Sequence, residues 1–589
     1  MLDFRNTNTV WASVLAETLA HLGLQTVVIS PGSRSTPLTI AFANHPHIQA
    51  IPMLDERSAS FFALGVAKAS GQPTALVCTS GTAGANYFPA IIEAYESGIP
   101  LMVLTADRPP ELRDCASGQT IDQQKLFGDY VRGYRELALP EATMSQLRYL
   151  RQTIAQLYQQ SQFPVPGPVH VNCPFRDPLA PISTGTDLAQ TLADPLNADF
   201  FAHLKEDGAI APITSGPPHL TSAWQHTERG LIIAGPQSTP SSAADGAYCK
   251  AIATLAHKLG WPVLADGLSP LRNHASLNPH LITTYDLLLR HEAHAQALVP
   301  EQVIQLGALP TSKVLRQWLT EINPHRWIID SSGRNRDPLH GRSVVLPITL
   351  DTLIAQYPVP NSSVQVTSPY CQQWLRRNER VRQRLREKFE TVDALFEGKL
   401  SWLLPSLLPS GTPLMIANSM PVRDVEWFWP LSDRGIRPYF SRGANGIDGT
   451  LSTALGIAHH HGQAVLLTGD LALLHDSNGF LNASTRSGHL TILLVNNQGG
   501  GIFESLPIAQ FEPPFEKFFA TPQAVDFATL AAAHQIDYEL VANWSVLADR
   551  LHELPTARVR LLELKCDRKL DAAFRAELLR SVGDFTLPD

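Results

Sequence analysis

Short apolar runs alternate with amphipathic stretches along most of the chain, which is the pattern of an α/β protein. In the N-terminal part the runs are residues 26–30, 75–79, 101–105 and 169–172, and residues 11–22 place apolar side chains at helical spacing before Gly23. Uninterrupted apolar runs separated by helices are typical of parallel strands that are buried on both faces. The pattern therefore predicts a doubly wound parallel sheet in this part.

The same alternation recurs in the middle and C-terminal parts of the chain. The expected strands are residues 231–234, 262–265, 303–306 and 327–330 in the middle part, and 414–417, 464–468, 490–495 and 559–564 in the last part. We therefore expect an α/β protein with three doubly wound parallel-sheet domains, joined by linkers rich in proline, serine and threonine. The expected boundaries are a first domain at 1–185, a linker at 186–225, a central domain at 226–355, a linker at 356–372 and a last domain at 373–589.

The composition of the 589 residues argues against several classes of protein. A net charge of −8 disfavours general nucleic-acid binding. Met1 opens no charged and then apolar leader, and no apolar run is long enough to span a bilayer, so we expect a cytoplasmic protein without a membrane partner. The six cysteines contain no Cys-x-x-Cys pair, which favours free thiols over disulfides or a zinc site. Adjacent rings on a helix diverge, so we do not expect His459, His460 and His461 to bind a metal.

Two polar residues follow neighbouring apolar runs near the C-terminus. Asp470 comes after residues 464–468 and Asn497 after residues 490–495, a separation that suits one strand–helix–strand unit. A right-handed crossover would bring both to the carboxyl edge of one sheet, where oxygen ligands suit Mg²⁺ on a phosphate. Gly499 could offer a backbone carbonyl beside them. The alternative is that Asp470 and Asn497 are helix caps, and the pattern alone leaves both interpretations open.

Arginines also follow the predicted strands. Arg34, Arg108, Arg423 and Arg442 all lie in loops at strand ends. Guanidinium groups bind carboxylates bidentately, so the set favours a substrate with several carboxylates, while each arginine singly could belong to a surface ion pair. The sequence has neither a Gly-x-Ser-x-Gly elbow nor a phosphate loop with its lysine.

The motif around Asp470 and Asn497 resembles the diphosphate-binding motif of thiamine diphosphate (ThDP) enzymes. The three predicted α/β blocks are similar to the pyrimidine-binding, central and diphosphate-binding domains of those enzymes. Longer motifs resemble one family among them, which makes 2-succinyl-5-enolpyruvyl-6-hydroxy-3-cyclohexene-1-carboxylate in menaquinone or phylloquinone biosynthesis. These motifs are SPGSRSTP at 30–37, DER at 55–57, TSGT at 79–82, LTADRPPEL at 104–112, SRGANGIDG at 441–449 and NNQGG at 496–500.

The resemblance implies an activity and a set of site residues. The activity is decarboxylation of 2-oxoglutarate and addition of the succinyl carbanion to isochorismate. Glu56 would be the catalytic acid–base group on the aminopyrimidine ring. The implied ligands of Mg²⁺ or Mn²⁺ are Asp470, Asn497 and the Gly499 carbonyl. Further cofactor contacts are implied for Ser80, Gly81, Asn418, Ser419, Ile447 and Leu471, where Ile447 would be the wedge that bends ThDP. The implied substrate contacts are Ser33, Arg34, Arg108, Gln119, Lys313, Arg423 and Arg442, with Ile502 and Phe503 as an apolar wall.

The resemblance also implies an assembly. Glu56 and Asp470 belong to different predicted domains, and in this superfamily the two domains meet between subunits. We therefore expect at least a homodimer, with a homotetramer as the alternative. Two rival functions are an acetolactate synthase-like carboligase and a cofactor-binding regulatory protein without catalysis. The arginine set disfavours the first because its substrates are monocarboxylates, and Glu56 disfavours the second.

Overall fold

The computed structural model describes residues 2–185, 187–202, 204, 224, 226–356, 367–483 and 488–586. They belong to two compact units, which we describe separately. The first unit joins Met1–Pro212 to Ser441–His460 and His475–Arg486, and the second joins Ile213–Phe440 to His461–Leu474 and Ser487–Asp589.

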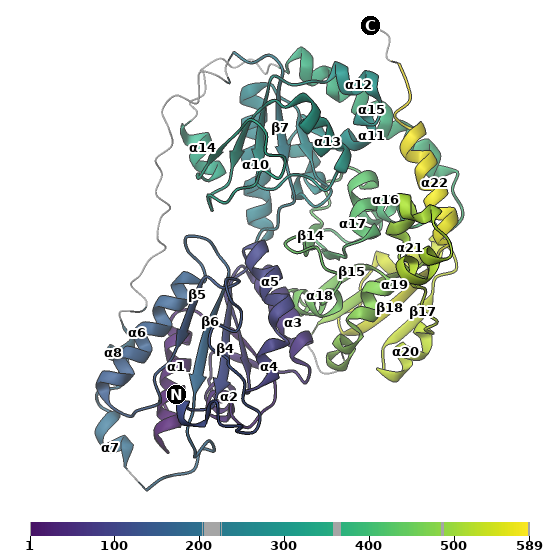
Figure 1. Cartoon of the computed structure of the whole chain (residues 1–589). Coiled ribbons are helices and arrows are strands. Elements are labelled where there is room, and N and C mark those ends of the chain that lie inside the picture. Colours follow the sequence, from purple (N-terminus) through teal and green to yellow (C-terminus); the bar gives the residue numbers. More distant parts are fainter. Residues whose placement is uncertain are drawn as a thin grey trace. The chain divides into compact units, whose positions relative to one another are not determined.

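The first unit contains a six-stranded parallel sheet. In spatial order its strands are β2 (Gln49–Pro52), β1 (Thr26–Ile29), β3 (Thr74–Cys78), β4 (Leu101–Asp107), β6 (Pro168–Pro174) and β5 (Gly133–Glu136). Every residue of β3, β4 and β6 is buried, because helices flank the sheet as Figure 1 shows. The helices that accompany this sheet are α1 (Thr7–His21), α2 (Thr36–Ala43), α3 (Glu56–Ser70), α4 (Thr82–Ala85), α5 (Phe88–Ser97), α6 (Met144–Gln160), α7 (Leu188–Leu192) and α8 (Ala198–Ala202).

The second unit contains two more six-stranded parallel sheets. The order of the first is β12 (Ser343–Leu346), β11 (His325–Ile329), β10 (Gln302–Leu306), β7 (Gly230–Ala234), β8 (Val263–Ala265) and β9 (Leu281–Ile282). The order of the second is β14 (Arg437–Phe440), β13 (Pro413–Ile416), β15 (Gln463–Gly469), β16 (His489–Asn496), β18 (Arg558–Lys565) and β17 (Asp537–Leu540). The predicted fold class, three parallel α/β sheets, is therefore confirmed.

Helices surround these two sheets as well (Figure 1). With the middle sheet lie α10 (Ser242–Leu259), α11 (Tyr285–Leu289), α12 (Glu292–Ala297), α13 (Lys313–Ile322) and α14 (Leu350–Gln356). The C-terminal part contributes α15 (Pro369–Glu390), α16 (Glu397–Leu407), α17 (Met420–Phe428), α18 (Thr450–His461), α19 (Asp470–His475), α20 (Phe527–Ala533), α21 (Trp544–His552) and α22 (Arg568–Ser581). Most of α18 belongs to the first unit.

The predicted linkers lie partly outside the described residues. Residues 205–223 of the first linker and 357–366 of the second belong to this group. The described part of the first linker contains α7 and α8, which the proline-rich pattern did not predict. The exact domain boundaries stay predictions.

The remaining sequence-based expectations concern thiols, histidines and membranes. All six cysteines are free thiols. Four of them are buried, whereas Cys115 is exposed. His459 Nε2 lies 3.0 Å from Gln49 Oε1, whereas His461 Nε2 lies 2.8 Å from the Tyr439 hydroxyl, so these two rings serve different partners. Within the described ranges no helix is both long and apolar enough to cross a bilayer.

Two glycines let α3 and α18 approach each other backbone to backbone in the first unit. A Cβ atom at Gly65 would overlap the Thr453 carbonyl, and a Cβ atom at Gly456 would overlap the Phe62 carbonyl. Backbone carbonyls cannot move aside as the end of a flexible side chain can, so this contact excludes any larger residue. It fixes the helix that begins at Glu56 against a segment from the C-terminal third of the sequence.

Replacing Gly65 with alanine should therefore destabilise the first unit. We expect Gly65→Ala to cost about 1–3 kcal/mol, the usual range for overpacking, and to lower the midpoint of thermal unfolding. The matched control is Gly246→Ala in α10, where a Cβ atom would meet nothing within 4 Å. That change should stabilise its helix by about 0.5–1 kcal/mol. Equal midpoints for the two variants would contradict the assigned helix contact.

Candidate active site

Asp470 and Asn497 lie at the carboxyl ends of two neighbouring strands in the second unit. β15 pairs with β16 in parallel, and Gly469 is opposite Val495 in the register. The Gly499 backbone N–H donates to Asp470 Oδ2 at 2.8 Å, which joins the two strand ends directly. The crossover therefore brings the two predicted metal ligands to one edge of the sheet.

Asn497 has an amide oxygen with no protein partner. The residue is 8% exposed, and its Oδ1 is buried without a hydrogen bond. A buried polar atom without a partner costs about 1–3 kcal/mol, so such an atom at a strand end calls for a ligand. An amide oxygen beside a carboxylate is a donor set that suits Mg²⁺ or Mn²⁺. The residues present thus fit the predicted metal, and the helix-cap interpretation does not account for Asn497.

The carboxylate of Asp470 is held in place by backbone donors. Its Oδ1 accepts from the Leu471 N–H at 2.8 Å, while Oδ2 accepts from Gly499. Burial raises the pKa of Asp470 to about 6, although both N–H groups favour the ionised form. A cation at this position would favour ionisation further.

The glycine run after Asn497 packs closely against the backbone of the segment that ends at Ala520. Gly499 has φ +136°, and a Cβ atom there would overlap the Ala520 carbonyl. Arg568 supports the loop from behind, since its guanidinium pairs with Glu504 at 2.7 Å and with Glu516 at 2.6 Å. The sequence reasoning missed Arg568, because an arginine on a charged helix carries no motif that marks it.

Three further predicted residues lie at the end of β13 in the same sheet. Asn418 is buried, and Ser419 has φ +72°, a left-handed conformation that a serine rarely adopts. The Arg423 guanidinium donates to the Ser419 carbonyl at 2.6 Å, one turn into α17. The turn is therefore stabilised by Arg423, a residue whose predicted role is a substrate contact.

A cavity of about 1290 Å³ lies in the second unit between α13, α17, α22 and the short helix Gly501–Ser505. Its lining includes Val314, Met420 and Gly501, which adjoin the predicted site residues Lys313, Ser419 and Ile502 in the sequence. Lys313 is exposed at the start of α13, and both Ile502 and Phe503 are half-buried.

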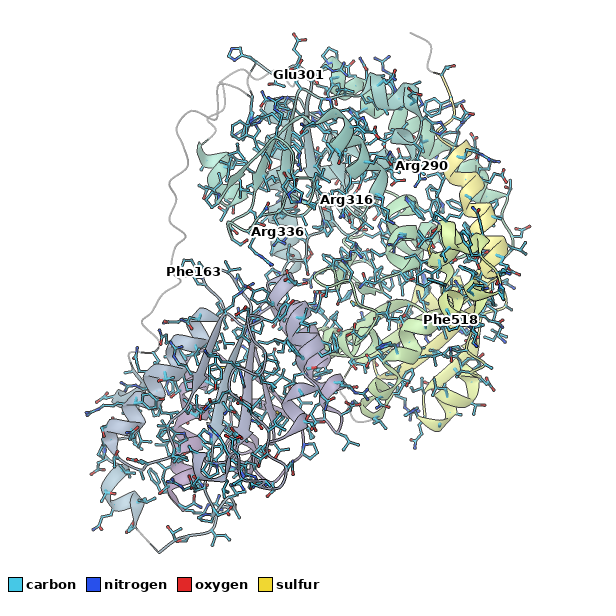
Figure 2. All side chains as sticks on the ribbon, in the orientation of Figure 1. Phe163, Arg290, Glu301, Arg316, Arg336 and Phe518 are labelled. Carbon is cyan, nitrogen blue, oxygen red and sulfur yellow. The ribbon has the colours of Figure 1, made fainter. Side chains whose placement is uncertain are left out.

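Cationic side chains reach this cavity from two elements. Figure 2 labels Arg290, which lines the cavity and pairs with Asp286 at 2.8 Å. Lys569 and Arg580 line it from α22. Glu292, Glu321, Glu504 and Glu512 line it too, so the cavity combines an apolar wall with charges of both signs.

In the first unit, three of the predicted residues meet at the carboxyl edge of the sheet. The Ser80 hydroxyl donates to the Gln119 carbonyl at 3.0 Å, and the Gln119 side-chain amide donates to the Ser80 carbonyl at 3.1 Å. Arg108 donates to the Gly118 carbonyl at 2.8 Å. The loop after β4 is thus folded back onto the loop after β3.

A buried amide that the sequence reasoning missed holds the same loops. Gln123 is 2% exposed; its Oε1 accepts from the Gly81 N–H at 2.8 Å, and its Nε2 donates to Asn172 Oδ1 at 3.0 Å. Asn172 in turn donates to Asp107 Oδ2 at 2.8 Å, beside Arg108. Gln123 lies in a polar loop, and nothing in the sequence distinguishes it from the neighbouring Gln124.

The turn after β1 contains Ser33 and Arg34. Ser33 is exposed, whereas Arg34 is 5% exposed and donates to the Phe175 carbonyl at 2.9 Å. The Nε atoms of Arg34 and Arg108 are both buried without a hydrogen bond, so each retains an unused donor. The structure thus gives Arg34 a partner within the fold in addition to its predicted substrate.

Glu56, Arg442 and Ile447 complete the set in the first unit. Glu56 is the first residue of α3 and is half-buried. Arg442 and Ile447 lie on the loop between β14 and α18, where the Thr450 hydroxyl donates to the Ile447 carbonyl at 2.8 Å. The predicted residues are therefore divided between the two units.

Comparison with known families assigns a class to this arrangement. The family described as "Thiamine pyrophosphate enzyme, N-terminal TPP binding domain" matches residues 10–126. "Middle domain of thiamine pyrophosphate" matches residues 215–416, and "Thiamine pyrophosphate enzyme, C-terminal TPP binding domain" matches residues 429–560. The fold and the two matched binding domains define a thiamine diphosphate enzyme.

Individual relatives narrow the class. The 2-succinyl-5-enolpyruvyl-6-hydroxy-3-cyclohexene-1-carboxylate synthases of Nostoc sp. and Trichormus variabilis are 53% and 54% identical to this chain, over 98% of each chain in both comparisons. The synthase of the same name from Trichodesmium erythraeum is 53% identical over 99% of this chain and 100% of its own. The chain belongs to this synthase family.

The metal assignment can be tested at Asp470. Asp470→Asn removes the negative charge from the site, so we expect at least a tenfold loss of ThDP affinity in the presence of Mg²⁺, measured by isothermal titration calorimetry. The control is Asp526→Asn, an exposed helix cap in the same unit, because asparagine caps helices as well as aspartate does. Equal ThDP affinities for the two variants would contradict the assignment.

Proposed function

We propose that the chain uses ThDP and Mg²⁺, or Mn²⁺, to decarboxylate 2-oxoglutarate and to transfer the remaining succinyl group to isochorismate. The products would be 2-succinyl-5-enolpyruvyl-6-hydroxy-3-cyclohexene-1-carboxylate and CO₂. This reaction would be a step of menaquinone or phylloquinone biosynthesis. The bond from C1 to C2 of 2-oxoglutarate breaks as CO₂ leaves, a carbon–carbon bond to the ring double bond of isochorismate forms, and a proton from solvent completes the addition. The observation that carries the proposal is sequence identity above 50% to synthases of this name over almost the whole chain.

The C-terminal group of residues would hold the cofactor's charged end. Asp470, Asn497 and the Gly499 carbonyl would ligate the metal, and the unpartnered Asn497 Oδ1 supports this role. Further contacts to the cofactor would come from Asn418, Ser419 and Leu471 in the second unit and from Ser80 and Gly81 in the first. Ile447 would be the apolar wedge against the cofactor. When bound, ThDP supplies an electron sink for the decarboxylation.

Glu56 would act on the aminopyrimidine ring. A carboxyl group at the start of α3 can hold a proton at a ring nitrogen and so favour the tautomer that serves as a base. Its half-buried position on this chain leaves the carboxyl accessible.

The arginines would recognise the two dicarboxylate substrates. Arg34 and Arg108 each keep a buried, unused Nε donor, and a carboxylate would satisfy such a donor. Ser33, Gln119, Lys313, Arg423 and Arg442 would supply the other polar contacts. Ile502 and Phe503 would exclude water, which favours loss of charge as CO₂ leaves.

The proposed active site needs a second copy of the chain. In the proposed assembly Glu56 of one subunit faces the metal ligands of another, so a homodimer is the smallest active form, and a homotetramer would contain two such pairs. The measurement is molar mass by light scattering in the presence of ThDP and Mg²⁺.

A direct assay tests the proposed reaction. Incubation with 2-oxoglutarate, isochorismate, ThDP and Mg²⁺ should give the six-carbon-ring tricarboxylate, followed by mass spectrometry. Pyruvate in place of 2-oxoglutarate should give no product. Its one carboxylate is the group that leaves as CO₂, and it lacks the second carboxylate that the arginines would bind. Turnover of pyruvate but not 2-oxoglutarate would instead favour an acetolactate synthase-like enzyme.

Replacing Glu56 with glutamine tests the catalytic assignment. Glu56→Gln should slow hydrogen–deuterium exchange at C2 of bound ThDP by at least a hundredfold, because the carboxyl proton is lost. Calorimetric affinity for ThDP and Mg²⁺ should change little, since the metal ligands are intact. If C2 exchange is as fast as in the natural enzyme, Glu56 does not have this role.

A further inference from the structure

A buried carboxylate on α5 holds the loop that carries Arg442 and Ile447. Glu93 is 3% exposed, and both of its oxygens face the loop in the first unit. The Gly443 N–H donates to Glu93 Oε1 at 3.2 Å, and the Ala444 N–H donates to Oε2 at 2.7 Å. One side chain thus fixes the two residues that follow Arg442.

The rest of the surroundings prepare Glu93 for this contact. The Ser97 hydroxyl donates to Oε1 at 2.6 Å, and Lys68 Nζ lies 3.5 Å from the same oxygen. Burial lowers the pKa of Lys68, while the charge of Glu93 opposes that shift. A buried carboxylate needs such partners, because an unpaired charge in the interior is strongly destabilising.

The loop has little freedom to adopt another position on α5. A Cβ atom at Gly443 would lie 2.9 Å from the Glu93 carbonyl and 2.8 Å from the Ser97 hydroxyl. Gly449 has φ +63°, and a Cβ atom there would overlap the Phe61 ring. The Glu93 hydrogen bonds thus hold the loop at Gly443 and Ala444, and close packing holds it at Gly449, with Ile447 between these two points.

We propose that Glu93 is a positioning residue, which sets Arg442 for substrate and Ile447 for the cofactor through its two hydrogen bonds to the loop backbone. The roles of Arg442 and Ile447 rest on the proposed function, whereas the loop contact does not. Each bond joins a backbone donor to an ionised acceptor, which is the stronger kind of hydrogen bond. Glu93 touches neither substrate nor cofactor in this proposal.

The test is Glu93→Gln in the full-length chain. Glutamine keeps one acceptor oxygen but turns an amide N–H₂ towards a loop N–H, so one of the two bonds is lost. We expect faster amide hydrogen exchange over residues 441–449 by mass spectrometry. In the assay with 2-oxoglutarate and isochorismate, we expect KM for at least one substrate to rise about tenfold, with a smaller change in kcat.

Two further variants separate positioning from structure. Glu390→Gln makes the same change at an exposed carboxylate at the end of α15 in the second unit, so exchange over residues 441–449 and KM should match the natural enzyme. Lys68→Met removes the ion pair but keeps both acceptor oxygens of Glu93. It should therefore lower the midpoint of thermal unfolding and leave KM close to that of the natural enzyme. If Lys68→Met reproduces the kinetic effect of Glu93→Gln, the pair is merely structural and the proposal fails.

The outcomes distinguish this proposal from the proposed function. Unchanged amide exchange over residues 441–449 in Glu93→Gln would overturn the positioning role, whatever the enzyme catalyses. If the natural enzyme gives no product from 2-oxoglutarate and isochorismate, the proposed function fails, and the exchange measurement still decides whether Glu93 holds the loop.

Discussion

The parallel pairing of β15 with β16 is the constraint on which the candidate active site depends. Because the two strands run side by side in register, Asp470 and Asn497 reach the same edge although a helix separates them in sequence. The hydrogen bond from Gly499 to Asp470 then closes the strand ends together. A slip of the register by one position would turn every side chain of β16 to the other face. Asp470 and Asn497 could then no longer bind the same cation.

The sequence predicted the interior of each sheet much better than its edges. All twelve strands expected from apolar runs are present, and all are inner strands. The six strands without an assigned run are the edge strands β2, β5, β9, β12, β14 and β17. An inner strand is covered on both faces and reads as a continuous apolar run, whereas β5 and β17 have half-buried or exposed residues throughout. Edge strands are therefore recognised only once their neighbours are known.

Residue types at the site could be read from the sequence, but their partners could not. Asp470 and Asn497 could be predicted as ligands because strand ends mark where ligands bind in α/β folds. Arg34 was predicted as a substrate contact, and the structure adds a hydrogen bond to the Phe175 carbonyl. Gln123 escaped notice because its role arises from burial between three chain segments, which no local pattern records.

The backbone contact between α3 and α18 bears on how this protein can be recombined. The first unit includes the stretch Ser441–His460, which lies more than two hundred positions beyond the strands of its sheet along the chain. A chimera that took only residues 1–185 from a relative would pair the relative's α3 with the α18 of this chain. Sequence blocks and structural units therefore differ in this enzyme, and an exchange of segments has to keep Gly65 and Gly456 together.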